Sequence, residues 1–197
     1  MKSPLTKAFE QIGGKLQAFS QAWDKIGSLD LMRQGAQANW LHSYSKNLLY
    51  KSKQIKEFKG NRKEEELFHK ALQEEIDQGI VIEVNPQSVK YLNKTFIIPK
   101  KDGRIRKILD CRQVNQQLGD LKYKSEDFRT VYNIAQRGDY GTTLDISSAY
   151  NHILVSDELQ QFLAFQFKGK TYTYRGMPFG LKTAPFIFHK HLLPAIT

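Results

Sequence analysis

The 197-residue sequence contains a single cysteine, Cys111. One cysteine excludes an internal disulfide and any cysteine-rich zinc site, so a reducing compartment is natural for this chain. No apolar run approaches the ~18–20 residues that span a bilayer, and no signal-peptide hydrophobic stretch follows the basic start Met1–Lys7. We therefore expect a soluble intracellular protein of the cytoplasm or nucleus that acts without a membrane. An organellar presequence stays open, although Glu10 and the lack of arginine before Arg33 count against it.

Acidic residues are also scarce, because 20 Asp and Glu face 30 Lys and Arg, which gives a formal net charge of +10. Such an excess favours a polyanionic partner, since lysines and arginines on phosphates release counterions. An acidic membrane surface or a merely soluble basic protein would satisfy the same balance. The 40% hydrophobic and 12% aromatic residues predict a globular chain with a real core, in one domain or two small lobes.

Residues 1–60 are predicted to form a helical section that ends in a basic linker. The first helix has apolar residues at three- and four-residue steps, the spacing of one buried face: Leu16, Phe19, Trp23 and Ile26. A second helix is predicted over Leu29–Ala38. The lysine-rich stretch 46–59 is equally consistent with a solvated connector and with an arm that contacts nucleic acid.

A stronger helix and two hairpins follow. Asn61 is predicted to cap the helix and Gly79 to end it, before a short strand at Ile80–Val84. The first hairpin pairs residues 95–98 with 104–109 around a tight Asp-Gly turn. Its second strand places Arg104 and Arg106 on one face, which suits contact with phosphates. Further elements are predicted as a helix at Phe128–Ala135, a short helix from Ser156 and a last helix from Thr183. A second hairpin is predicted at 162–174, with its turn at Lys168–Lys170 and the alternating aromatic residues of its strands on a common face.

Asp145 is the most suggestive single acid. A β-rich run, Thr142–Ile146, is predicted to deliver it at the end of a strand, and small residues and then Tyr150 follow. An acid in this setting suits the floor of a metal-dependent phosphoryl-transfer site. The ordinary alternative, a strand that ends at a capping aspartate, is favoured when the stretch is taken alone.

Four blocks stand in order along the chain: Phe96–Arg106, Ile108–Asn115, Leu144–Tyr150 and Met177–Phe188. Together they resemble the fingers and first part of the palm of a retroelement reverse transcriptase, over residues 64–197. The resemblance implies an α+β right-hand polymerase fold with the helical section in front of it. It divides the chain into the extension 1–60, fingers at 61–120 and 151–183, and a partial palm at 121–150 and 184–197. The earlier run Ile12–Leu16 with Phe19 and Trp23 is similar to the segment that precedes this domain in tyrosine-recombinase (DIRS-like) retrotransposons, with a gypsy-like lineage as the alternative.

The resemblance also implies roles at the chemical centre. Asp145 would be the first metal-binding carboxylate, and the backbone carbonyl of Ile146 a further ligand, for Mg²⁺ or Mn²⁺. Two-metal transfer of a nucleotide to a primer hydroxyl needs carboxylates that hold two ions about 3.5–4 Å apart. Tyr150, beside Ala149, would lie under the incoming sugar and exclude a ribose 2′-hydroxyl.

Other residues would contact the nucleotide and the nucleic acid. Arg106 with Lys100 or Lys101 would hold the triphosphate, since a guanidinium can bind phosphate through two hydrogen bonds. The loop at Phe179 and Gly180 would lie against the nucleotide and the template. Further contacts to nucleic acid are expected from Arg104, Lys107 and Arg112. Asp110 and Arg112 are expected to form a structural ion pair.

One feature opposes catalysis by this polypeptide. The family carries two further aspartates on a hairpin beyond the helix that begins at Pro185, and residues 186–197 contain no acid. One carboxylate cannot hold two metals, so a metal is expected only if the missing carboxylates are supplied. The chain is then an incomplete copy of a polymerase, which we favour, one half of a split enzyme, or a non-catalytic nucleic-acid-binding or assembly protein. The expected partners are an RNA or DNA template–primer, a dNTP and a second chain with the rest of the palm.

Overall fold

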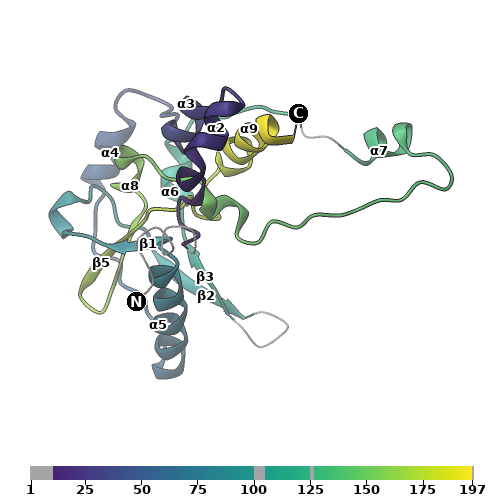
Figure 1. Cartoon of the computed structure of the whole chain (residues 1–197). Helices are drawn as coiled ribbons and strands as arrows, with labels where there is room; N and C mark the ends of the chain where they lie inside the picture. Colours follow the sequence, from purple (N-terminus) through teal and green to yellow (C-terminus); the bar gives the residue numbers. More distant parts are fainter. Residues whose placement is uncertain (1–10, 100–104, 125–126, 197) are drawn as a thin grey trace.

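The computed structural model describes residues 11–99, 105–124 and 127–196, which form a mixed α+β fold (Figure 1). The α-helices are α2 (Ser20–Lys25), α3 (Leu29–Gln34), α4 (Ser45–Lys51), α5 (Arg62–Asp77), α6 (Arg112–Gln116), α7 (Phe128–Ile134), α8 (Asp157–Gln160) and α9 (Ala184–Ile196). The 3₁₀ turns are η1 (Lys15–Phe19), η2 (Pro86–Ser88) and η3 (Ala149–His152). The strands are β1 (Val81–Glu83), β2 (Thr95–Pro99), β3 (Ile105–Leu109), β4 (Ala164–Phe167) and β5 (Lys170–Tyr174). Among the described residues, no helix is both long enough and apolar enough to cross a membrane.

A three-stranded antiparallel sheet has the order β1-β5-β4. Its β4–β5 hairpin turns through Lys168 and Gly169, whose φ angles of 49° and 73° are both positive. Positive φ at both central residues matches the right-handed twist of the strands that they join. The predicted second hairpin is therefore confirmed.

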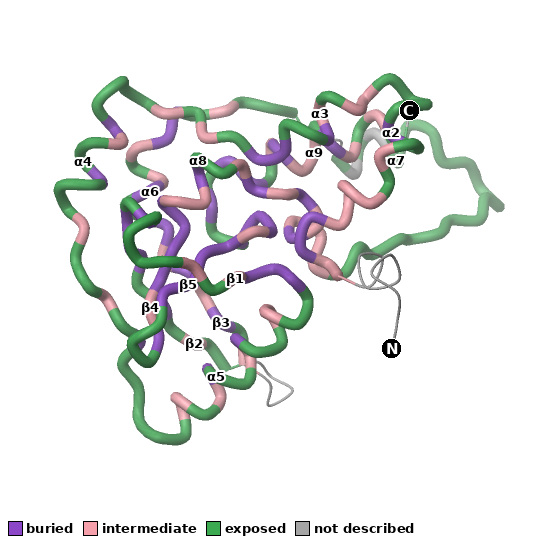
Figure 2. Tube along the Cα trace, turned by 60° about the vertical axis from the view of Figure 1, so that its left-hand side comes forward, coloured by how far each residue is buried: buried purple, intermediate pink, exposed green. Residues whose placement is uncertain are grey.

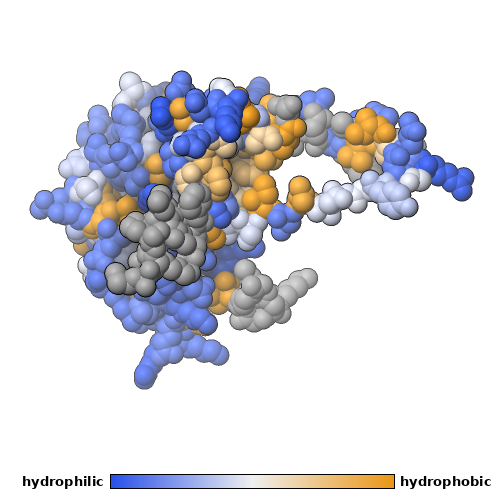
Figure 3. Space-filling view, in the orientation of Figure 1, coloured by the Kyte–Doolittle hydropathy of each residue, from blue (hydrophilic) through white to orange (hydrophobic). Residues whose placement is uncertain are grey.

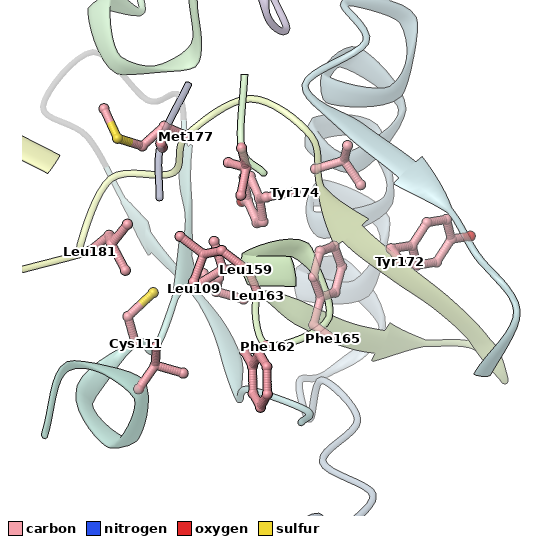
Figure 4. Close-up of a cluster of buried hydrophobic side chains, with 14 of the residues drawn as sticks. Leu109, Cys111, Leu159, Phe162, Leu163, Phe165, Tyr172, Tyr174, Met177 and Leu181 are labelled. Atoms are coloured by element: carbon pink, nitrogen blue, oxygen red, sulfur yellow. The ribbon is translucent and has the colours of Figure 1, made fainter. Parts of the chain in front are cut away.

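The core lies between this sheet and α5. Phe68 of α5 is fully buried, with its ring 4.6 Å from that of Phe167 and 4.4 Å from that of Phe58. Phe165 and Tyr172 stack across the β4–β5 ladder at 5.6 Å, as their predicted common face requires. Figure 4 shows Phe165 and Tyr174 of the sheet beside aliphatic side chains from β3 and α8. Such rings bury the most apolar area per residue and dominate the stability of a small core.

Helix α5 begins and ends as its sequence predicts. The Asn61 side chain accepts a hydrogen bond from the Glu64 amide, and the Glu64 carboxylate accepts one from the Asn61 amide. This reciprocal cap satisfies two amides that the helix itself leaves unpaired. Gly79 follows the helix with a φ of 64°, which a glycine adopts without strain.

The β2–β3 hairpin pairs the two strands that the sequence predicts. Its ladder runs from the Thr95–Leu109 pair to the Pro99–Ile105 pair, and residues 100–104 lie outside the described structure. The predicted Asp-Gly turn at Asp102 and Gly103 falls in this stretch and is therefore outside the described residues.

The N-terminal section packs beside α9 (Figure 1). The described chain outside residues 127–146 is here called the body. Trp23 is buried as predicted, but Phe19 and Ile26 are 42% and 47% exposed, so the predicted stripe is wrong at these two positions. The reason is that residues 15–19 form a 3₁₀ turn, whose three-residue period rotates the stripe away from α-helical spacing. Helix α3 ends at Gln34, four residues earlier than predicted.

Residues 127–146, here called the arm, project from the body and carry α7 (Figures 1 and 2). Every arm side chain that the structure describes is exposed, and Thr142–Ile146 is irregular. The predicted strand is therefore wrong. A strand needs a neighbour for its backbone hydrogen bonds, and no described residue pairs with this run.

Candidate functional site

Two segments predicted to contact a nucleotide lie together in the structure. Tyr150 lies in η3, and Phe179 lies in the loop between β5 and α9. Their ring centroids are 4.8 Å apart, and Phe188 of α9 packs against Tyr150 at 5.5 Å. Ala149 precedes Tyr150 in the same turn and is partly buried. Ala149, Tyr150, Phe179 and Gly180 thus belong to one surface.

The turn that carries Tyr150 is fixed by local backbone bonds. Ser148 adopts a left-handed conformation with a φ of 54°, and its carbonyl accepts a hydrogen bond from the Asn151 amide at 2.9 Å. The Ile153 amide donates to the Tyr150 carbonyl at 3.1 Å. Burial is the largest cause that raises the pKa of the Tyr150 phenol above its ordinary value. The ring therefore presents a neutral hydroxyl near neutral pH.

Asn115 holds the loop at Phe179 and Gly180. Its Nδ2 donates to the Gly180 carbonyl at 2.8 Å, and its Oδ1 accepts from the Lys182 amide at 2.8 Å. Gly180 has a φ of 95°, which only glycine adopts readily. Sequence reasoning gave Asn115 no role, although it ends one of the four recognised blocks. Its side-chain amide, which can donate and accept at once, was the signal available.

Of the residues predicted to hold the triphosphate, Arg106 belongs to the described part of the chain. It lies exposed on β3, opposite Ile98 of β2. Lys100, Lys101 and Arg104 fall in the stretch 100–104, outside the described residues. The hairpin that carries this exposed residue projects from the body below the arm in Figure 1.

Lys107 differs from its prediction. Its side chain is 1% exposed, and its Nζ lies 2.8 Å from a Glu75 carboxylate oxygen and donates to the Tyr174 hydroxyl at 2.8 Å. Burial lowers the pKa of Lys107 and raises that of Glu75, while the ion pair opposes both shifts. An ammonium enclosed in this way cannot reach a phosphate, so we no longer place Lys107 among the nucleic-acid contacts. Strand alternation then turns its neighbour Arg106 outward.

Asp110 and Arg112 form the predicted ion pair. The guanidinium donates two hydrogen bonds to the carboxylate, at 2.8 and 2.7 Å, and these bonds are the main cause that lowers the pKa of Asp110. Arg112 is also 82% exposed at its side chain. Both residues line a polar cavity of about 390 Å³. The cavity is completed by Gln54, Lys56, Tyr91, Lys94, Gln113 and Gln116.

Asp145 stands apart from these groups. It lies in the exposed part of the arm, and Ile146 beside it is 44% exposed. Among the residues that the structure describes, no three His, Cys, Asp or Glu side chains gather where they could hold a metal ion. The predicted nucleotide-binding rings are therefore assembled, whereas a two-metal centre around Asp145 is not assembled from the described chain.

Comparison with known proteins identifies the family. Residues 98–196, half of the chain, match the family "Reverse transcriptase (RNA-dependent DNA polymerase)". The chain belongs to the reverse transcriptase family. Among its relatives, the Pol polyprotein of the Drosophila melanogaster transposon 297 is 28% identical over 124 residues, which are 60% of this chain and 11% of that protein. The Pro-Pol polyprotein of simian foamy virus type 1 is 27% identical over 113 residues, 57% of this chain and 10% of that protein.

Solved reverse transcriptases share the fold. The prototype foamy virus protease–reverse transcriptase CSH mutant superimposes with a TM-score of 0.63 and 19% identity, over 98% of this chain and 27% of that one. The foamy viral protease–reverse transcriptase in complex with dsDNA gives a TM-score of 0.55 and 20% identity, over 72% and 27% of the two chains. The predicted α+β reverse-transcriptase fold is thus confirmed. The chain spans about a quarter of the length of these solved proteins and about a tenth of the polyproteins above.

Proposed function

We propose that this reverse transcriptase segment binds a deoxynucleotide and a template–primer as the fingers and first part of the palm. In this proposal residues 61–120 and 151–183 are fingers and residues 121–150 and 184–197 belong to the palm. The observation that carries it is the contact between Tyr150 and Phe179, held by Asn115. Two rings from segments far apart in the sequence form a surface on which a nucleotide can rest.

Each of these residues has a physical task in the proposal. The Tyr150 ring, backed by Phe188, would fill the space that a ribose 2′-hydroxyl needs and leave room for a deoxyribose. Phe179 is 53% exposed, so its face is available to a base. Arg106 would bind phosphate oxygens through two hydrogen bonds, together with Lys100 or Lys101. No proton needs to move at Tyr150, because its phenol is neutral.

A bound strand would also contact the polar cavity beside α6. Lys56, Lys94 and Arg112 give this cavity three cations against the one carboxylate of Asp110. The Lys56 ammonium donates to the buried Tyr91 hydroxyl at 2.8 Å, which fixes its position. Arg104, which lies outside the described residues, stays a proposed contact to nucleic acid. A net positive, amide-lined cavity suits the phosphodiester backbone of a template.

The metal requires more than the described chain supplies. Reverse transcriptases use Mg²⁺, which would promote attack of the primer hydroxyl on the nucleotide, and Mn²⁺ could replace it. Asp145 and the carbonyl of Ile146 are oxygen donors of the kind that these ions prefer. They do not by themselves fit a two-metal centre, because no group of three or more His, Cys, Asp or Glu side chains that could hold a metal ion forms among the described residues. We derive no catalytic step from this site and propose that another polypeptide segment or chain completes it.

A binding role without chemistry is the second candidate. The exposed position of Asp145 on the arm favours it, because nothing in the described structure holds the carboxylate at a reacting atom. In that case the same cationic surface would bind nucleic acid as an assembly or packaging element. The two candidates share the binding surface and differ only in the need for Asp145.

The affinity for a fluorescently labelled template–primer tests both. We expect Kd to rise steeply with salt, and Arg106→Gln and Lys94→Gln each to weaken binding and reduce the salt slope by about one. Lys25→Gln, an exposed lysine on α2, is the matched control and should change neither. An affinity that is insensitive to salt and to these two substitutions would contradict nucleic-acid binding on this surface.

Primer extension separates the two candidates. With Mg²⁺ and dNTPs, we expect no extension by this polypeptide alone, because one carboxylate cannot hold two metals. Extension that appears when a second polypeptide with an aspartate pair is added, and disappears with Asp145→Ala, would establish the polymerase role. Binding that survives Asp145→Ala, with no extension under either condition, would establish the binding role.

We also propose the tyrosine-recombinase lineage for this chain, on the run Ile12–Leu16 with Phe19 and Trp23. A tyrosine recombinase gene in the same genetic element would support this lineage. An integrase with an acidic catalytic triad in that position would contradict it.

A further inference from the structure

Gly13 and Gly14 join the N-terminal section to the body at backbone distance. A Cβ on Gly13 would lie 1.9 Å from the Gly79 carbonyl oxygen and 2.7 Å from the Ile80 nitrogen, so no side chain fits there. Gly14 has a φ of 70°. The two positions therefore require glycine for different reasons, the first for close approach and the second for its backbone conformation. We call Ile12–Gly14 the glycine strap.

The glycine strap forms hydrogen bonds with three parts of the body. The amides of Ile12 and Gly13 both donate to the carbonyl of Gln78, the residue that directly follows α5, at 3.0 and 2.9 Å. The Arg175 guanidinium, just after β5, donates to the Gly13 carbonyl at 3.0 Å. The Gly14 amide donates to the Asn151 carbonyl in η3 at 2.9 Å. The strap thus fixes η3 relative to both α5 and the end of β5.

Asn151 connects the strap to both rings of the candidate site. It is buried, and it directly follows Tyr150 in η3. Its side-chain Nδ2 donates to the Met177 carbonyl at 3.1 Å, two residues before Phe179. A Cβ on Gly176 would lie 2.6 Å from the Asn151 carbonyl oxygen, so this contact is also tight. The residue that receives the strap therefore holds the segments of Tyr150 and Phe179 together.

We propose that the glycine strap positions the Tyr150–Phe179 ring pair through Asn151 and so sets how strictly the site excludes a ribose 2′-hydroxyl. The specificity part rests on the proposed function of Tyr150. Steric exclusion works only when the excluding ring cannot retreat, and a displacement of about 1 Å is enough to admit a hydroxyl. The N-terminal section is then a working part of the nucleotide site.

A matched pair of variants in the full chain separates positioning from general strain. Gly14→Ala and Gly27→Ala both place a side chain at positive φ, 70° and 65°, so their backbone strain is similar. A Cβ at Gly14 would lie 2.9 Å from Leu154 Cδ1, whereas a Cβ at Gly27 meets nothing within 4 Å. Asn151→Ala removes the bond to Met177 without touching the strap. It gives a second test if a strap variant fails to fold.

The first measurement follows the contact between the Tyr150 and Phe179 rings and does not depend on activity. In NMR spectra we expect Gly14→Ala and Asn151→Ala to weaken the contacts between the Tyr150 and Phe179 rings. The Ile153 amide should exchange about tenfold faster, or about 1.4 kcal/mol, with no change in β4 and β5. Gly27→Ala should change neither quantity. Ring contacts that persist in Gly14→Ala, or that weaken equally in Gly27→Ala, would overturn the positioning role.

The second measurement is the ratio of dATP to ATP affinity for the same proteins. We expect this ratio to fall about tenfold in Gly14→Ala, a change of about 1.4 kcal/mol, and to stay constant in Gly27→Ala. A constant ratio despite lost ring contacts would overturn the specificity part. If the wild-type chain binds neither nucleotide, the proposed function of Tyr150 fails, and the ring contacts alone decide whether the strap positions the pair.

Discussion

The body and the arm carry the two halves of one predicted site, and only the body's half is assembled. Tyr150 and Phe179 touch at 4.8 Å on a fold whose core aromatics, such as Phe68 and Phe165, are fully buried. Asp145 lies on the arm, where Leu144 is 91% exposed and Tyr140 fully exposed. Figure 3 shows the arm standing away from the body. Tyr150 and Phe179 are held in place because their segments pack against the body. Asp145 is not held in this way, because the arm that carries it is exposed.

Backbone hydrogen bonding explains the difference. The β4–β5 hairpin satisfies its own ladder and buries its aromatic face against α5. The run Thr142–Ile146 has strand-forming residues but no described neighbour to pair with, so water satisfies its amides. Side-chain propensity alone does not stabilise a single strand.

Hydrogen exchange gives the largest expected contrast between the two regions. Amides of residues 141–146 should exchange at nearly the rates of an unfolded chain, whereas amides of β4 and β5 should be protected at least about 10³-fold. Exchange followed by mass spectrometry measures both in one sample. Strong protection of residues 141–146 would show that the arm pairs within this chain or with a second copy.

Cavity-forming substitutions extend the contrast to stability. Phe68→Ala removes a fully buried ring and should lower the free energy of unfolding by about 3–5 kcal/mol. Leu144→Ala, on the arm, should change it by less than about 0.5 kcal/mol. Urea denaturation measures both. A large effect of Leu144→Ala would mean that the arm side chain is buried in solution.

Local signals in the sequence predicted much of the body. Asn61 with Glu64 identified the start of α5, and the Lys168-Gly169 pair identified the second hairpin. The four blocks identified the family and brought Tyr150 and Phe179 into one site. Neighbouring residues decide the helix cap and the hairpin turn, whereas the pairing of Tyr150 with Phe179 followed only from the family resemblance.

What the sequence could not give depends on distant partners. Lys107 is a lysine on a basic strand, which suggests a phosphate contact. Its partner Tyr174 is 67 residues away, and only the folded chain shows that Lys107 is buried beside it. Asn115 forms a hydrogen bond with Gly180, 65 residues further along the sequence, so no local pattern predicts its role. The strand at Thr142–Ile146 failed for the opposite reason, because its composition is right and its neighbour is not among the described residues.

Breaking the buried ion pair should have the next largest effect. Lys107→Met leaves the Glu75 carboxylate without its counterion and should lower the stability at pH 7 by about 3 kcal/mol. Burial raises the pKa of Glu75, so protonation favours the folded state and part of the loss should return as the pH falls toward 5.

Denaturation at pH 5 and pH 7 measures this recovery. Lys70→Met, an exposed lysine on α5, is the matched control and should be neutral at both values. The double variant Lys107→Met, Glu75→Gln should lose the pH dependence. A loss in Lys107→Met that grows as the pH falls would contradict the role of the unpaired carboxylate.

Releasing the loop at Phe179 and Gly180 should have a smaller, local effect. Asn115→Ala removes two hydrogen bonds to the loop and should cost about 1 kcal/mol, because both groups can bind water instead. The Lys182 amide should then exchange about fivefold faster, while Gln116→Ala, its exposed neighbour on α6, should leave that amide unchanged. Equal exchange in the two variants would show that other contacts hold the loop.

The smallest expected effect concerns the most suggestive acid of the sequence. Asp145→Asn should change the free energy of unfolding by less than about 0.5 kcal/mol, since Asp145 is exposed. Thermal denaturation measures this change. Destabilisation above about 1 kcal/mol would place Asp145 in a folded, paired strand and remove the distinction between arm and body. A neutral result leaves Asp145 as a residue whose position another segment or chain must fix, which is what the proposed completion of the palm requires.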